Sequence, residues 1–255
     1  MTTRRRFVQA TIAIGLTATG AAPKYGAAQS RERVLVAGGT GRTGRFVVAD
    51  LIRSGTQVRG LTRSPDRAKE RAPDAEWVEG DVRDPSSLIE AFKGIDRVIS
   101  VLGATETTGP NSPEAVEYQG NVNLIDLAKS TGAQQLVMIT SLSAGRVDSE
   151  PELAERFRGM GWKNKAEHYL RDSGLAYTIV GPGGLRDYEG GTQGIQFQPE
   201  TEIKTGVISR EDVGAVMAEA VRNSAALMKT LRIVNDASLP VNGWRSALAD
   251  VPKDA

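Results

Sequence analysis

The sequence contains no cysteine and only one histidine, His168. The absence of cysteine excludes disulfide bonds, thiolate metal sites and cysteine nucleophiles. A single histidine also argues against a histidine-based metal site, so we predict no bound metal. The longest mildly apolar run, residues 10–22, is too short and too polar for a transmembrane helix, so stable membrane insertion is not expected.

An excess of charge of one sign is also missing. The 32 basic and 31 acidic residues leave a net charge of +1. Residues 1–28 contain Arg4, Arg5, Arg6 and Lys24 and no acid, so the rest of the chain carries 28 basic and 31 acidic residues, a net charge of −3. A near-neutral, slightly acidic body gives no reason to expect a nucleic-acid partner. The length of 255 residues fits one main α/β domain.

Residues 1–28 have the three-part pattern of an export signal. Arg4 and Arg5 precede the apolar run, and the small residues Gly26-Ala27-Ala28 follow it as a site for a signal peptidase. The pattern resembles a twin-arginine signal, which predicts a periplasmic or otherwise exported protein with a folded domain at residues 29–255. The alternatives are an uncleaved amphipathic arm, or a start codon placed too early, which would leave the protein in the cytoplasm.

The remaining chain alternates between strand and helix patterns. Aliphatic and β-branched runs predict strands at residues 33–37, 57–62, 77–79, 97–102, 135–140, 177–180 and 230–234. Helical spacing predicts helices at residues 42–53, 65–71, 85–93, 113–131, 152–173 and 210–223. Alternation of this kind implies parallel pairing, so the expected fold is α/β, a Rossmann-like doubly wound parallel sheet. The Gly-rich, polar segment 182–206, with a predicted small hairpin, and the weakly patterned tail from Asn235 are expected to form a small C-terminal substrate cap.

A glycine-rich loop joins the first predicted strand to the first predicted helix. Gly38 would permit the tight turn, Gly41 would let the backbone approach a pyrophosphate, and Gly44 would let the helix pack closely. The amides and dipole at the helix N-terminus then attract phosphate. The sequence therefore predicts a dinucleotide site. The expected contacts in this loop are Gly38, Thr40, Gly41, Arg42, Thr43 and Gly44.

The residues after the second predicted strand favour NADP(H) over NAD(H). NAD binding normally uses an acid about 20 residues beyond the loop for the ribose hydroxyls. No acid occurs between Asp50 and Asp66, and Arg63, together with Arg42, can instead pair with a 2′-phosphate. The alternative for Arg63 is a solvated surface charge.

Two further segments complete the predicted cofactor site. Asp81 can accept a hydrogen bond from the adenine amino group, with Val82 against the ring. The alternative for Asp81 is a turn residue that bonds its own backbone. Leu102 and Gly103 end the fourth predicted strand, where the cofactor crevice of an open α/β sheet is expected.

Together these residues resemble the atypical short-chain dehydrogenase/reductase superfamily, in particular its NAD(P)H-binding NmrA-like and flavin (biliverdin) reductase-like members. The resemblance runs from Arg33 to about Val234. Its marks are the segments 38–44, 80–82, 100–103, 140–141, 165–167, 173–175, 181–185 and 208–213. It implies hydride transfer from the nicotinamide to a small planar acceptor such as a flavin, quinone or carbonyl compound.

Typical members of the superfamily use a serine and a Tyr-x-x-x-Lys motif for acid/base work. Ser141, at the end of the fifth predicted strand, matches the serine, and Lys165 matches the lysine that holds the nicotinamide ribose. Gly161 stands at the tyrosine position and carries no proton donor. Two accounts follow. Either solvent or a flavin nitrogen manages the proton, or the protein is a non-catalytic NAD(P)H-sensing or assembly protein.

Overall fold

The computed structural model describes residues 32–157 and 159–254. The predicted export signal at residues 1–28 lies outside the described residues. The described residues belong to one compact unit.

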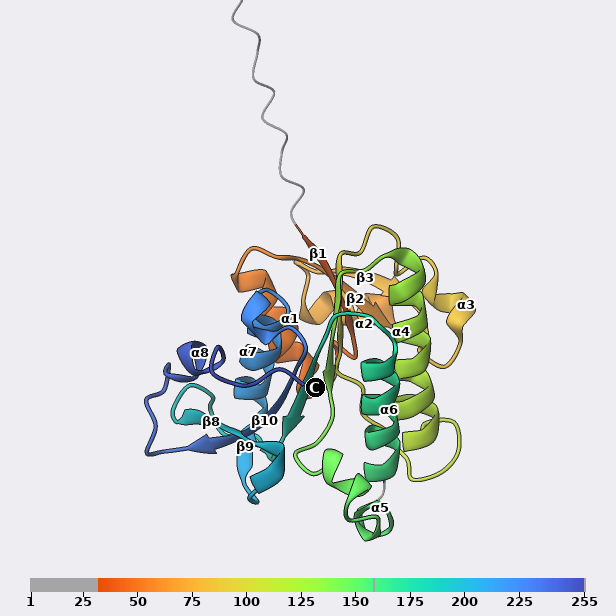
Figure 1. Ribbon diagram of the computed structural model, residues 1–255. Coiled ribbons are helices and arrows are strands. Elements are labelled where there is room, and N and C mark those ends of the chain that lie inside the picture. The colour runs from red at the N-terminus through yellow and green to blue at the C-terminus, as the bar shows by residue number, and fades with distance from the viewer. Residues whose placement is uncertain (1–31, 158, 255) are drawn as a thin grey trace, which may run out of the picture. The chain divides into compact units, whose positions relative to one another are not determined.

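The unit is built on an eight-stranded sheet in the order β3-β2-β1-β4-β5-β6-β10-β8 (Figure 1). Its strands are β1 (Arg33–Ala37), β2 (Gln57–Thr62), β3 (Glu76–Glu79), β4 (Arg97–Ser100), β5 (Gln135–Ile139), β6 (Tyr177–Pro182), β8 (Gly194–Gln198) and β10 (Lys229–Asp236). All neighbours pair in parallel except β8, which runs antiparallel to β10. The strand order reverses direction between β1 and β4. The Rossmann-like, doubly wound parallel sheet predicted from the sequence is confirmed.

Helices cover both faces of the sheet. The α-helices are α1 (Gly44–Arg53), α2 (Pro65–Arg71), α3 (Pro85–Leu88), α4 (Gly120–Thr131), α5 (Glu152–Arg156), α6 (Met160–Asp172), α7 (Arg210–Ala220) and α8 (Trp244–Ala247). Figure 1 shows α1, α7 and α8 on one side of the sheet and α4 and α6 on the other. No helix in the described ranges has both the length and the apolar character needed to cross a bilayer.

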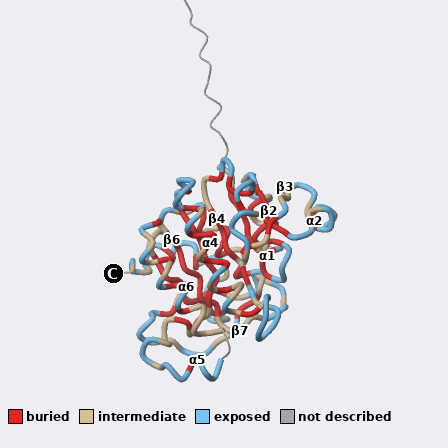
Figure 2. Tube along the Cα trace, turned by 90° about the vertical axis from the view of Figure 1, so that its right-hand side faces the viewer, coloured by how far each residue is buried: buried red, intermediate tan, exposed pale blue. Residues whose placement is uncertain are grey.

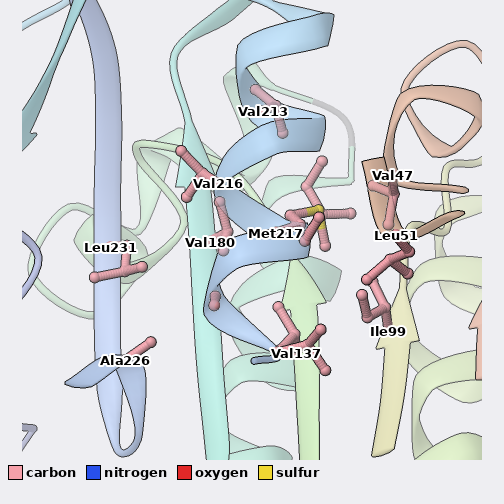
Figure 3. Packing of buried hydrophobic residues seen from close by; sticks show 14 of the residues in the cluster. Val47, Leu51, Ile99, Val137, Val180, Val213, Val216, Met217, Ala226 and Leu231 are labelled. Carbon is pink, nitrogen blue, oxygen red and sulfur yellow. The ribbon is translucent and has the colours of Figure 1, made fainter. Parts of the chain in front are cut away.

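Two apolar clusters hold the layers together, one on each face of the sheet. Side chains alternate along a strand, so Val34 and Val36 of β1 point into one cluster while Leu35 and Ala37 point into the other. On the α1–α7 side, Leu51 and other residues of α1 pack with residues of α7 (Figure 3). Figure 2 shows the central strands buried, whereas α2 and α5 are mostly exposed. Each fully buried aliphatic side chain contributes about 1.5–3 kcal/mol, so the core fixes the sheet on which the loops rest.

Three predicted helices differ from the observed elements. The helix predicted at 85–93 ends at Leu88. The segment predicted as one helix at 113–131 begins as a π-helix (Pro113–Gln119) and continues as α4. The segment 152–173 is divided into α5 and α6, because Gly159 adopts a positive φ of 88° that interrupts the regular helix.

The predicted hairpin within residues 182–206 is wrong. The strand β7 (Gly184–Arg186) pairs in parallel with β9 (Val207–Ser209) in a small second sheet. The intervening strand β8 joins the edge of the main sheet, where Ile195 is buried beside the last strand. Burial of Ile195 against the main core outweighs strand pairing within residues 182–206. The hairpin prediction failed because it considered only this local pairing.

Candidate functional site

A cleft of about 880 Å³ lies at the carboxyl ends of the parallel strands. The loops that follow β1 to β6 meet there, at the point where the strand order reverses, which is where open α/β sheets bind ligands. All but one of the predicted site residues line it. Those in the lining are Gly38, Thr40, Gly41, Arg42, Thr43, Gly44, Arg63, Asp81, Val82, Leu102, Gly103 and Ser141. Lys165 is absent from this lining.

The glycine loop has a backbone that side chains would obstruct. Gly38 adopts a φ of 83°, and a Cβ there would lie 2.4 Å from the carbonyl oxygen of Val101. A Cβ on Gly44 would lie 2.1 Å from the Gly38 oxygen, so this glycine allows α1 to start close against its own loop. A Cβ on Gly41 would meet only the Gly38 oxygen, at 3.1 Å, and Gly41 lines the cleft. The middle glycine therefore keeps the approach to the loop open.

The first turn of α1 is suited to an anion. No side chain caps its N-terminus at Thr43, and no acidic residue lies in its first turn. The amides of Arg45 and Phe46 donate to the carbonyls of Gly41 and Thr43, at 3.1 and 3.0 Å, so what the helix end offers is the positive end of its dipole. A phosphate group supplies the negative charge that this end favours.

Positive charge dominates the cleft wall. Within the described part of the chain, two acidic side chains line it, Asp81 and Glu117, and each forms an ion pair with a basic neighbour. The basic side chains in the lining are Arg42, Arg63, Arg67, Arg71, Arg83, Lys163 and Arg210. This excess of positive charge favours a ligand with several negative charges.

Asp81 and Val82 form a wall beyond the end of β3. The Asp81 carboxylate accepts hydrogen bonds from Nε and the backbone N–H of Arg83, at 2.8 and 3.0 Å. The side-chain bond from Arg83 lowers the pKa of Asp81 to about 2, so the carboxylate is charged at neutral pH. The carbonyl of Val82 accepts from Nδ2 of buried Asn123 at 2.8 Å. Asp81 therefore forms the local turn bond, to the backbone N–H of Arg83, that was the alternative to an adenine contact. It also lines the cleft.

Ser141 lies two residues after the end of β5, and a buried ion pair holds its backbone in place. Its carbonyl accepts a hydrogen bond at 2.8 Å from Nη1 of Arg232. The guanidinium of Arg232 is fully buried and binds both carboxylate oxygens of Glu167, each at 2.8 Å. A bidentate pair of this kind holds both partners in one geometry, which fixes the backbone that carries Ser141.

The two lysines near the start of α6 take different directions. Lys163 lines the cleft and forms an ion pair with Glu117, with 2.9 Å between Nζ and Oε1. Lys165 is exposed, and its Nζ lies 4.2 Å from the ring centroid of Trp162. Residues two apart on a helix point to different sides. The structure therefore brings Lys163, and not Lys165, to the cleft.

Comparison with known proteins identifies the family. The model of a family described as NAD(P)H-binding matches residues 38–224. The chain belongs to this NAD(P)H-binding family. An uncharacterised chloroplast protein of Arabidopsis thaliana is 31% identical over 224 residues, which are 79% of this chain and 69% of that protein. Sanguinarine reductase of Eschscholzia californica is 29% identical over 238 residues, covering 75% of this chain and 86% of the reductase.

A solved structure supports the same assignment. The putative NAD-dependent epimerase/dehydratase of Bacillus halodurans superimposes with a TM-score of 0.75 at 26% identity, covering 84% of this chain and 99% of that chain. The resemblance to NAD(P)H-binding, NmrA-like proteins of the atypical short-chain type is thereby confirmed.

Sequence reasoning missed Lys163 and Glu117 of this NAD(P)H-binding protein. One signal for Lys163 lay in the helix itself: Ala166 and Leu170 are buried, and Lys163 stands three and seven positions before them on the same face. Glu117 had no local signal, because its importance depends on contact with a lysine 46 positions later in the chain.

Proposed function

We propose that this protein is an NADP(H)-dependent oxidoreductase of the atypical short-chain type that reduces a small planar acceptor, such as a flavin, a quinone or a carbonyl compound. One observation carries the proposal. The lining of a single cleft includes the open glycine loop and also Ser141 and Lys163. A nucleotide anchored at the loop and a group that reacts with the help of these two proton-bearing side chains can therefore share the same cavity.

The residues present fit NADP(H). The first turn of α1, which has no acidic residue, and the open approach over Gly41 suit a pyrophosphate. The exposed guanidinium of Arg63, at the end of β2, suits the 2′-phosphate and is supported by Arg67 one turn into α2. Asp81 and Val82 suit the adenine ring. These assignments rest on the lining of the cleft and on the charge of its wall.

The chemistry divides between the coenzyme and the protein. When bound, NADPH supplies the hydride. The ammonium of Lys163 and the hydroxyl of Ser141 are the groups that can donate hydrogen bonds to the ribose and to an acceptor oxygen or nitrogen. Lys163 rather than Lys165 takes the role that the superfamily gives to its lysine, because only Lys163 lines the cleft.

Spectrophotometry of NADPH oxidation tests the proposal. The purified protein is incubated with NADPH and a panel of flavins, quinones and carbonyl compounds, and absorbance of the reduced nicotinamide is followed. We expect turnover with at least one acceptor, a loss of at least tenfold in kcat for Lys163→Met, and little change for the matched control Lys165→Met. Tight NADPH binding without turnover on any acceptor would instead support the non-catalytic sensing or assembly function.

The export signal is proposed on sequence alone. The pair Arg4-Arg5 with the apolar run and small residues that follow supports twin-arginine export of the folded protein. Cell fractionation of the native chain and of the variant with Arg4→Lys and Arg5→Lys tests it. We expect the native chain outside the cytoplasm and the variant retained inside; equal distribution of the two would refute this export route.

A further inference from the structure

The position of the missing tyrosine changes once Lys163 is taken as the lysine. In a Tyr-x-x-x-Lys spacing that ends at Lys163, the tyrosine would stand at residue 159, which is a glycine. Gly159 has a φ of 88°, a conformation that a tyrosine adopts only with strain. A Cβ there would lie 3.0 Å from Oε2 of Glu117 and 3.2 Å from Pro113. A carboxylate from another segment therefore stands beside the place where the tyrosine side chain would begin.

In the alternative Tyr-x-x-x-Lys spacing, which ends at Lys165, the tyrosine position is Gly161, and both residues lie away from the cleft. A Cβ on Gly161 would meet only the Cβ of Ala154, at 3.1 Å, so a side chain at 161 would start toward α5. Neither Gly161 nor Lys165 lines the cleft. The residues that can do the work of a tyrosine–lysine couple are therefore Glu117 and Lys163.

Glu117 is held on both sides. Only 8% of its surface is exposed, and its Oε1 accepts a hydrogen bond from the backbone N–H of Ala104 at 3.1 Å while pairing with Lys163. Its own carbonyl accepts from Nδ2 of buried Asn121 at 2.6 Å. The Asn121 Oδ1 in turn accepts from the hydroxyl of Ser100 at the end of β4. The carboxylate is thus anchored to the loop after β4.

The π-helix presents Glu117 to this position. Residues 113–119 form a π-helix before α4. Such wide turns are rare in proteins, and those that occur are often found at functional sites. The exposed Glu114 in the same π-helix does not line the cleft. The backbone of the π-helix therefore places Glu117, and not Glu114, against Lys163.

We propose that Glu117 is a positioning residue that takes the place of the absent tyrosine by holding the side chain of Lys163 directed into the cleft. The inference rests on the proposed function. Lys163 donates a proton to the acceptor atom that becomes negative when hydride arrives, and the resulting amine recovers a proton from solvent. An ammonium has three N–H donors, so pairing with Glu117 leaves donors for the ligand.

Kinetics of Glu117→Gln tests this role, with Glu114→Gln as the matched control on the same π-helix. Glutamine keeps the size and a hydrogen-bond acceptor but removes the charge. We expect kcat to fall at least tenfold, because Glu117 positions the proton donor, while the Kd for NADPH stays within about threefold, because the phosphates and the adenine are assigned to other residues. Glu117→Asp keeps the charge on a shorter side chain and should recover part of kcat. A kcat for Glu117→Gln equal to that of the native protein would overturn the inference.

Competitive acetylation of the cofactor-free protein provides a readout independent of turnover. Acetylation at Nζ requires Lys163 to leave its ion pair with Glu117, and a variant without the carboxylate frees the amine for reaction. We expect Lys163 to be acetylated at least threefold faster in Glu117→Gln than in the native protein, by peptide mass spectrometry. Lys165, two residues away, is the internal control and should react at an unchanged rate. An unchanged rate at Lys163 would refute its control by Glu117.

The two experiments separate this inference from the proposed function. If the native protein reduces no acceptor, the proposed function fails, and acetylation still decides whether Glu117 controls Lys163. If the native protein turns over and Glu117→Gln turns over equally well, only the role of Glu117 fails. Should Glu117→Gln not fold, acetylation of Glu117→Asp decides instead: a Lys163 rate above that of the native protein supports the couple, and an equal rate refutes it.

Discussion

Replacement of Arg63 by alanine should weaken binding of NADPH and leave binding of NADH nearly unchanged. Arg63 lines the cleft just after β2, and its one hydrogen bond within the described chain is a long one, 3.4 Å from Nη1 to Oδ1 of Asn111. Its guanidinium can therefore turn to a 2′-phosphate without breaking a strong contact. NADH lacks that phosphate and gains nothing from the arginine.

The magnitude follows from the exposure of the site. A hydrogen bond to a charged group contributes about 1.5–3 kcal/mol. Arg63 is exposed, and water and salt screen its charge, so the effective contribution is about 1–2 kcal/mol. This corresponds to a Kd for NADPH raised roughly 5- to 30-fold. The loss should be smaller at high salt than at low salt.

Calorimetric titration with both coenzymes at fixed ionic strength measures the effect. The matched control is Lys69→Ala, which removes an exposed positive charge from α2 that does not line the cleft, and it should change neither affinity by more than about twofold. An equal loss of NADPH and NADH affinity in Arg63→Ala, or no loss of either, would refute the assignment of the 2′-phosphate to Arg63.

Three further predictions concern the loop, the buried ion pair and the edge of the core. Gly41→Val should weaken binding of both coenzymes at least tenfold and lower the unfolding free energy less than Gly44→Ala, because a Cβ at 41 would lie 3.1 Å from the Gly38 oxygen whereas a Cβ at 44 would lie 2.1 Å from it. We expect Gly44→Ala to cost about 1–3 kcal/mol, and equal losses in the two variants would contradict this. Arg232→Met leaves buried Glu167 with the longer contact to Arg171, at 3.4 Å, as its remaining ion pair and should cost about 3–5 kcal/mol by urea denaturation. Adding Glu167→Gln should restore part of that loss, and no restoration would argue against a charge penalty. Burial and a hydrogen bond to a carboxylate raise the pKa of Tyr177 to about 12. Since the unfolded value is about 10, the associated stability is complete below pH 10 and is lost as pH rises through 12. The stability difference between the native protein and Tyr177→Phe should therefore shrink between denaturation at pH 9 and at pH 11.5, and a constant difference would disprove the shift.

The amino-acid sequence alone determined the fold and one end of the site. The strand predicted at 33–37 is β1 and the strand predicted at 57–62 is β2, because short aliphatic runs bounded by glycine and charge have few other ways to be buried. Gly38, Gly41 and Gly44 could be placed for the same reason. Each acts through its own backbone and its immediate neighbours, and that information is contained in a short stretch of chain.

Only the tertiary structure decided the other end of the site. The choice of Lys163 over Lys165 depends on the direction in which α6 begins, and Gly159 sets that direction by its positive φ. The pairing of Lys163 with Glu117 joins two helices that are far apart in the sequence. The spacing within α6 indicates which face Lys163 shares, but it does not indicate that Glu117 faces it, because each helix satisfies its own local pattern whichever neighbour it later meets.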